Sequence, residues 1–298
     1  MNKLLRSGLN IGSSVQSLLK SLTVKSSNQI QVKPIPDSIA ESKTPIITYP
    51  WLLSTSKMRQ EEPTFWSTIK QRELLYPEIE RVQTHHLKKP TYDFPYYFYD
   101  DIKEVIEELF LVDLVSGTSE CNTMVKSLNN IFAFEFMELK KNNITLEFDF
   151  KTEDNIPEFN TRLVQVLCTY GAYPIPPGYV AQVWPTYTLV VPEEELLFKS
   201  YDYQKKLQKI AMDEGVYIKV DTQLTFTNGV EFILRDKNGT VFFRDYRKRI
   251  DVQFCTPHFT PWDEIYELDS EGNWQLRFKW RVSDIDYLIS GVFLEEYG

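Results

Sequence analysis

The fold is decided by the stretch Trp274-Gln275-Leu276-Arg277-Phe278-Lys279-Trp280-Arg281-Val282-Ser283. Apolar side chains occupy every second position of this stretch, and charged or polar side chains stand between them. Successive side chains of a strand point to opposite faces of a sheet, whereas a helix would distribute these residues around its axis. The stretch therefore predicts one long strand with a buried face that carries the two tryptophans.

The same alternation extends over the block 216–289, which we expect to be an antiparallel meander. Val216, Ile218, Val220, Leu224 and Phe226 share one face of its first strand. Short turns join antiparallel neighbours. Three turn signals divide the block, namely Asn228-Gly229, Asp236-Lys237-Asn238-Gly239 and Asp269-Ser270-Glu271-Gly272-Asn273. Because a ten-residue strand is about 33 Å long, such a sheet is expected to twist and to curl over the elements that precede it.

Helical patterns dominate the residues before this block. Asp101 and Glu104 have the spacing of a capping box in front of an apolar stripe. The patterns predict helices over 102–110, after Ser119, behind Pro157 as far as Tyr170, and from Pro192 to Gly215, with short strands over 145–150 and 179–191. The fold class that follows is α+β. Helices would pack against a long, strongly curved antiparallel sheet in a domain that spans residues 101–298.

Residues 37–100 are expected to form a proline- and aromatic-rich arm with one short helix near Thr64–Leu75. The arm is too apolar for a free linker, since it carries Trp51, Phe65 and Trp66. Tyr92–Tyr99 contains six aromatic rings in eight residues. Such a cluster either anchors the arm in the core or forms a contact surface for another protein, because aromatic side chains dominate the energetics of interfaces.

Residues 1–36 are basic, contain no acid and are rich in serine. Leu4, Ile11, Val15, Leu18 and Leu22 form one apolar stripe at helical spacing. This composition is typical of a mitochondrial presequence. Two other interpretations are an amphipathic helix that docks on the domain and a helix that lies on a membrane surface.

Charge and cysteine content restrict the class of protein. The chain has 33 basic and 42 acidic residues; five of the basic ones lie in 1–36, so the remainder has 28 against 42 and a net charge of −14. This balance argues against extensive phosphate contact by the folded part. The three cysteines, Cys121, Cys168 and Cys255, are far apart in the chain, which favours buried thiols in a reducing compartment. The sequence contains no candidate transmembrane helix.

No catalytic or cofactor-binding motif is present in the sequence. Phosphate-binding glycine loops, dinucleotide fingerprints, paired-cysteine ligand sets and nucleophile elbows are all missing. His85-His86 is the only histidine pair, and no Cys or carboxylate stands near it at ligand spacing. We therefore expect two surface histidines that point apart, and we expect no metal, no cofactor and no catalytic residue.

The folded part has one basic cluster, which lies in the predicted sheet. A charged strand edge that resists aggregation explains this cluster most simply. A nucleic-acid, anionic-lipid or acidic-protein contact is the alternative. The cations of the cluster are Arg244, Arg247, Lys248 and Arg249.

The order of elements resembles the nuclear-transport-factor-like superfamily of cone-shaped α+β domains, in particular the C-terminal domain of the mitochondrial import-motor anchor and its mitoribosomal relative. Four segments carry the resemblance, 230–232, 236–239, 250–254 and 272–276, within residues 100–289. Enzymes of that superfamily use an Asp, His or Tyr inside the cone. The resemblance therefore makes His258, Asp221, Asp251, Asp284 and Asp286 the candidate site residues, although strand parity or a strand end places each of them away from the core.

These observations predict a non-catalytic accessory or scaffolding subunit of a mitochondrial inner-membrane assembly, most specifically a respiratory-chain complex. The protein would lie in the matrix or on the matrix side of the inner membrane. Other protein subunits would be its partners. A mitoribosomal subunit is one alternative, supported by the basic cluster. The other alternative is an enzyme or binder of small molecules, which would need an open, polar pocket inside the cone.

Overall fold

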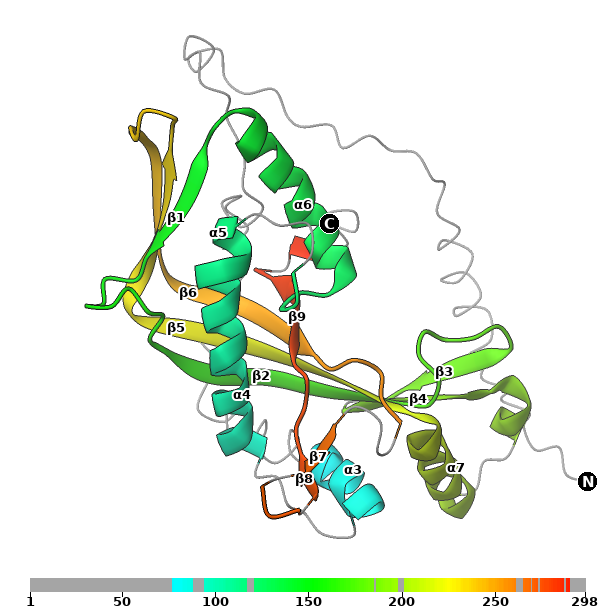
Figure 1. Cartoon of the computed structure of the whole chain (residues 1–298). Helices are drawn as coiled ribbons and strands as arrows, with labels where there is room; N and C mark the ends of the chain where they lie inside the picture. Colours follow the sequence, from blue (N-terminus) through cyan, green and yellow to red (C-terminus); the bar gives the residue numbers. More distant parts are fainter. Residues whose placement is uncertain are drawn as a thin grey trace, which may run out of the picture. The chain divides into compact units, whose positions relative to one another are not determined.

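The protein has an α+β fold in which helices pack on a strongly curved sheet (Figure 1). The computed structural model describes residues 77–87, 94–116, 121–184, 186–197, 201–260, 265–268, 270–272, 274–286 and 288–289, all within one compact unit, Ile46–Gly298. The expected presequence over 1–36 and the expected helix near Thr64–Leu75 lie outside the described residues. No helix of the described part is both long enough and apolar enough to cross a membrane.

The main sheet has seven strands and is centred on β5 (Val216–Arg235) and β6 (Val241–Cys255). Its strand order is β3-β4-β2-β5-β6-β9, and β1 also pairs with β5. The remaining strands are β1 (Thr145–Asp149), β2 (Phe159–Tyr170), β3 (Tyr179–Val183), β4 (Tyr187–Pro192) and β9 (Arg281–Ile285). The β2–β4 pair is parallel and the other pairs are antiparallel, so the sheet is mixed and not purely antiparallel as predicted.

Helix α4 (Phe94–Glu108) closes one face of this sheet with aromatic side chains. Phe98 packs edge-on against Phe254 of β6 and against Trp280, with ring centroids 5.9 and 4.9 Å apart. Phe110 packs in the same way against Phe226 of β5 at 6.0 Å. The predicted apolar face of β5 is confirmed, because all five of its residues are buried. Aromatic side chains therefore fill the space between α4 and the sheet.

The described part of the aromatic stretch, residues 94–99, belongs to a helix of the folded domain and not to an extended arm. Helix α4 begins at Phe94, well before the expected start behind Asp101, so the predicted capping box is wrong. Before α4 stands α3 (Pro77–Leu87), whose Ile79 and Val82 join the core. Phe94 and Phe98 are buried, whereas Tyr97 and Tyr99 are exposed. The core anchor is therefore confirmed for the buried side of α4, and a protein contact on its exposed side stays a prediction.

Three further helical segments depart from their predicted bounds. After α4 the chain continues as a π-helical turn, η4 (Leu109–Asp113), and a short α5 (Leu114–Ser116). Helix α6 (Lys126–Lys141) begins later than expected, since the chain first pairs Met124 with Val282. Pro192 ends β4, and a 3-10 turn (Glu193–Leu197) separates it from α7 (Tyr201–Glu214). Ile210 of α7 is exposed.

The stretch from Trp274 to Ser283 is not one strand. Its first residues form β8 (Trp274–Leu276), which pairs with β7 (Tyr266–Leu268) in a separate two-stranded sheet, and its last residues enter β9. The residues between have no ladder partner, because β6 ends at Cys255, opposite Arg281. Alternation nevertheless persists, with Phe278, Trp280 and Val282 buried between exposed cations.

Residues 159–170 form strand β2 and not the predicted helix. The strand pairs with β5 from Phe159 to Tyr170, and a register shift between Leu163 and Gln165 interrupts the pairing. A bulge changes the parity of the side chains that follow it. The apolar residues on both sides of the bulge therefore imitate helical spacing, although each half alternates as a strand does.

Asn228-Gly229 marks a bulge inside β5 and not the predicted hairpin. The β5–β6 register shifts between Thr225 and Val230, and β5 continues to Arg235. Gly229 has a φ of 75°, and a Cβ on it would collide with the ring of Tyr246. The predicted turn at Asp236-Lys237-Asn238-Gly239 is confirmed, and it joins β5 to β6.

Candidate functional site

The candidates suggested by the superfamily resemblance do not converge on one site. The Nε2 of His258 lies 2.7 Å from the carbonyl oxygen of Gly171, at the junction of β2 with the segment after β6. Asp221 accepts a hydrogen bond of 2.6 Å from Nε2 of Gln253. Asp221 and Asp251 are partly exposed. As predicted, they lie on the face of the sheet that does not carry the buried apolar side chains. These contacts connect strands and aim no acid into the core.

Asp284 and Asp286 form an acidic pair in which Asp284 is buried, contrary to our expectation, and Asp286 is half-buried. A bulge separates Gln253 from Phe254 in the β6–β9 register, and Asp284 is only 3% exposed. Asp284 accepts the N–H of Ile289, and Asp286 accepts that of Asp251 at 3.0 Å. Burial, opposed by that hydrogen bond and by Arg247, raises the pKa of Asp286 to about 6. The pair occupies the end of β9, where the chain turns back.

Asp286→Asn is expected to stabilise the fold at neutral pH. Because the folded pKa of about 6 exceeds the usual 3.8, the unfolded chain releases this proton first as pH rises. Wild-type stability therefore decreases between about pH 4 and 6 relative to the variant, and the variant gains up to about 3 kcal/mol above that window. Asparagine tolerates the φ of 47° at this residue and still accepts a hydrogen bond.

Urea unfolding of both proteins from pH 4 to pH 8 measures this difference. Asp154→Asn removes an exposed carboxylate and serves as the matched control, for which we expect a pH profile like that of the wild type. If the free energy of unfolding depends on pH in the same way for the wild type and Asp286→Asn, Asp286 does not cause the loss of stability between pH 4 and 6.

The basic cluster of β6 does not form a single surface. Arg244 and Arg247 lie on opposite faces, because their partners on β5 have opposite parity. Arg247 Nε bonds Asp245 at 2.7 Å, and Arg244 lies 3.6 Å from Glu231. Lys248 and Arg249 are exposed beside the bulge. The cluster is thus divided between two faces, and acids accompany at least two of its cations.

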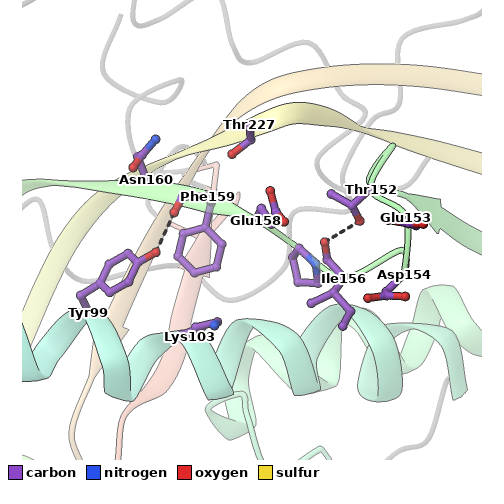
Figure 2. A pocket seen from close by; sticks show the side chains of 11 residues that line it. Tyr99, Lys103, Thr152, Glu153, Asp154, Ile156, Glu158, Phe159, Asn160 and Thr227 are labelled. Atoms are coloured by element: carbon purple, nitrogen blue, oxygen red, sulfur yellow. Dashed lines mark hydrogen bonds between the residues drawn. The ribbon is translucent and has the colours of Figure 1, made fainter.

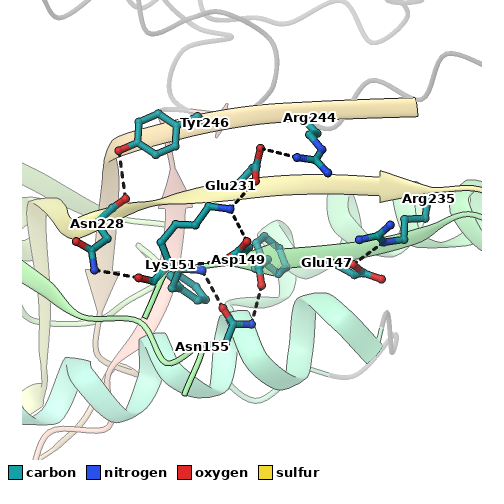
Figure 3. Close-up of polar contacts among 11 residues, drawn as sticks. Glu147, Asp149, Lys151, Asn155, Asn228, Glu231, Arg235, Arg244 and Tyr246 are labelled. Atoms are coloured by element: carbon teal, nitrogen blue, oxygen red, sulfur yellow. Dashed lines mark hydrogen bonds and ion pairs between the residues drawn. The ribbon is translucent and has the colours of Figure 1, made fainter. Parts of the chain in front are cut away.

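Lys151 is the centre of a polar network that ties the loop after β1 to β5 and β6 (Figure 3). Its Nζ contacts Asp149 at 2.5 Å and Glu231 at 2.9 Å, and Glu231 also faces Arg244. The Nδ2 of Asn228 donates to the carbonyl oxygen of Lys151 at 3.0 Å. The hydrogen bond between Lys151 and Asp149 lowers the pKa of Asp149. The same hydrogen bond raises the pKa of Lys151. Exposed ion pairs stabilise little, so the network chiefly positions the loop.

Asn155 fixes the path of the same loop through its own side chain. Its Oδ1 accepts the N–H of Phe150 at 2.8 Å, and its Nδ2 donates to the carbonyl oxygen of Phe148 at 2.9 Å (Figure 3). Asn155 and Lys151 both have positive φ values, 54° and 56°. The loop therefore adopts a strained but well-bonded conformation that forms one wall of a pocket.

That pocket has a volume of about 500 Å³ and lies between α4 and the start of β2 (Figure 2). Its rim is polar. The lining residues are Tyr99, Lys103, Thr152, Glu153, Asp154, Ile156, Pro157, Glu158, Phe159, Asn160 and Thr227. The hydroxyl of Tyr99 donates to the carbonyl oxygen of Phe159 at 3.0 Å, which holds α4 against β2. The pocket lies at the edge of the domain and not inside the curled sheet.

Three acids against one lysine make this pocket suited to a small polar molecule with a positive charge. No sequence motif marks the pocket, because its residues come from a helix, a loop and two strands. The acidic turn Glu153-Asp154-Asn155 is the sole local signal, and by itself it indicates an exposed turn. Sequence reasoning therefore missed this pocket.

The cysteines stay thiols, as the sequence indicated. Cys168 and Cys255 are buried, and Cys121 is half-buried. Burial is the main cause that raises the pKa of both Cys168 and Cys255. A thiol held in its protonated form is a weak nucleophile, so the two buried cysteines act as packing residues.

His85 and His86 are not independent surface residues, and they do not point apart as predicted. Both rings lie near Asp213 of α7, which stands 128 residues away from His85 in sequence. Neighbouring helical residues diverge by only about 100°, so long side chains can still meet at one partner. Sequence spacing could not reveal this partner, because α7 follows four intervening strands.

The chain matches no protein-family model, and no curated protein matches it. Function is therefore inferred from the residues and their geometry.

Proposed function

We propose that this protein is a non-catalytic accessory or scaffolding subunit of a mitochondrial inner-membrane assembly, most specifically of a respiratory-chain complex. The observation that carries the proposal is the filled interior of the curled sheet. Phe98, Phe254 and Trp280 fill the space between α4 and the sheet, and all three are at most 4% exposed. Because side chains fill that space, we expect partners to bind on the outer surface of the domain.

The outer surface carries large apolar side chains that suit contacts with other subunits. Phe134 and Met137 project from α6 with exposed fractions of 60% and 56%, and they are neighbours at i, i+3 spacing. Val183 and Trp184 stand at the end of β3, an edge strand of the sheet, and Val183 is 79% exposed. Apolar and aromatic anchors at exposed positions are the residues around which interfaces form.

The mitochondrial part of the proposal rests on residues 1–36. Their basic, acid-free and amphipathic character is what a matrix-directed presequence needs. The resemblance to the import-motor anchor agrees with this location and belongs to the same proposal. The four cations of β6 give little support to a mitoribosomal role, because they are divided between two faces.

Native gels of gently extracted mitochondria test the proposal. We expect the protein to migrate with an assembly much larger than 35.1 kDa. The double variant Phe134→Glu/Met137→Glu places charges in the apolar pair and should release at least about tenfold more free protein, a loss of about 1.4 kcal/mol in association. Lys209→Glu, at an exposed position of α7, is the matched control and should remain assembled.

Migration of the wild-type protein as a free monomer would overturn the subunit proposal. That outcome would favour the second candidate function, which is binding of a small cationic molecule in the pocket beside α4. The pocket of about 500 Å³ and its acidic rim are the observations that favour this candidate.

A further inference from the structure

Helix α3 is firmly attached to the sheet by its first turn. The carboxylate of Glu78, 4% exposed, accepts a hydrogen bond of 2.6 Å from the hydroxyl of Tyr170 and one of 3.2 Å from that of Thr186. Arg81 Nη1 contacts the same carboxylate at 2.9 Å. These bonds set the rotation of α3 about its axis, and so they determine which way its last turn faces.

The last turn of α3 faces α7 and brings three potential metal ligands together. Nε2 of His85 lies 2.8 Å from Oδ1 of Asp213. The ring of His86 packs edge-on against that of His85, with centroids 4.6 Å apart. One ligand atom from each of the three residues lies within 4.8 Å of the other two.

His86 has a buried nitrogen that no group satisfies. Its Nε2 is buried and has no hydrogen-bond partner in the structure. A buried polar atom without a partner destabilises a fold, and a metal ion that accepts its lone pair would remove this penalty. Neutral imidazole is the form that binds metals.

We propose that His85, His86 and Asp213 bind one Zn²⁺ ion that links α3 to α7. Two imidazoles and one carboxylate form a common ligand set for zinc, with water in the fourth position. Bonds of about 2.0–2.2 Å require the three side chains to close around the ion. Asp213 can move toward it, since its side chain is 65% exposed, and the same exposure gives the ion a path from solvent.

Cobalt and zinc titrations of the untagged full chain, first stripped with a chelator, test this site. We expect one equivalent of Co²⁺ to bind with the visible absorption of a tetrahedral site, and one equivalent of Zn²⁺ to displace it. Asp213→Asn and His86→Ala should each weaken binding at least about tenfold. Mutation of a residue that only hydrogen-bonds a metal ligand already lowers affinity by that factor, and these two residues are ligands themselves. Zn²⁺ should also raise the Tm of the wild type, because it binds the folded state.

Asp202→Asn removes another exposed carboxylate of α7 and is the matched control, expected to bind like the wild type. Asp213→Asn lies at an exposed position, so it keeps the test valid if His86→Ala fails to fold. Equal binding by the wild type and Asp213→Asn would assign the metal to adventitious surface ligands and overturn the proposal. Absence of saturable binding would overturn it as well and leave the His85–Asp213 hydrogen bond as the whole contact.

Discussion

Replacing Phe98 with alanine is expected to lower the free energy of unfolding by about 3–5 kcal/mol, the usual effect of truncating a buried aromatic ring. Phe98 is 1% exposed and contacts Phe94, Phe254 and Trp280. Its removal would leave a cavity between α4, β6 and the segment before β9. Urea unfolding followed by circular dichroism measures the loss.

Tyr97 provides the matched control because it is the preceding residue of the same helix and is 45% exposed. Tyr97→Ala should change stability by less than about 0.5 kcal/mol, as is usual for surface substitutions. Similar losses for the two variants would contradict the division of the aromatic stretch into a buried and an exposed side. If Phe98→Ala does not fold, Phe98→Leu at the same position is expected to lose less stability and remains measurable.

Gly171→Ala is expected to destabilise the fold by a similar amount, about 3–5 kcal/mol in total. Gly171 follows the last residue of β2 and has a φ of +106°. A Cβ there would lie 2.2 Å from the carbonyl oxygen of Val190, a backbone atom that cannot rotate away. Its N–H donates to Gly215 at 2.9 Å, and its own carbonyl oxygen contacts His258. The substitution would therefore disturb β2, β4 and the end of α7 together.

Gly178→Ala separates backbone strain from steric collision. Gly178 has a φ of +82°, but a Cβ on it would meet no atom within 4 Å. We expect this control to lose only about 1 kcal/mol, the strain of an alanine with positive φ. Equal Tm decreases for the two variants would show that the close approach to Val190 is unimportant.

The aromatic stretch shows how far a local pattern leads. Six rings in eight residues predicted either a core anchor or a contact surface. Helical periodicity separates Phe94 and Phe98, one turn apart and buried, from Tyr97 on the outer side. The stretch could not reveal this by itself, because it lies upstream of the apolar stripe, 102–110, that predicts the helix.

Residues 159–170 show where local pattern fails. Their apolar spacing fits a helix, yet pairing with β5 makes them a strand with a bulge. Pairing with a strand about sixty residues away contributes more than the helix propensity of one segment, which is a weak determinant. A bulge cannot be recognised before the partner strand is known.

The candidate sites were largely invisible to sequence reasoning. The pocket beside α4 combines residues of four elements, and the His85–His86–Asp213 cluster joins two helices across 128 residues. Each set consists of ordinary residues without motif spacing. Their chemistry arises from where tertiary packing places them.

By itself, the sequence determined the faces of the sheet. Alternation along β5, along the end of β6 and from Phe278 to Val282 predicted which side chains are buried, because the two-residue period of a strand is a local property of the backbone. Tertiary structure decided where strands end, which strands pair and which side chains meet. The stretch from Trp274 to Ser283 shows both: its alternation persists, while its division between two sheets depends on β6, which ends at Cys255 and offers no partner beyond it.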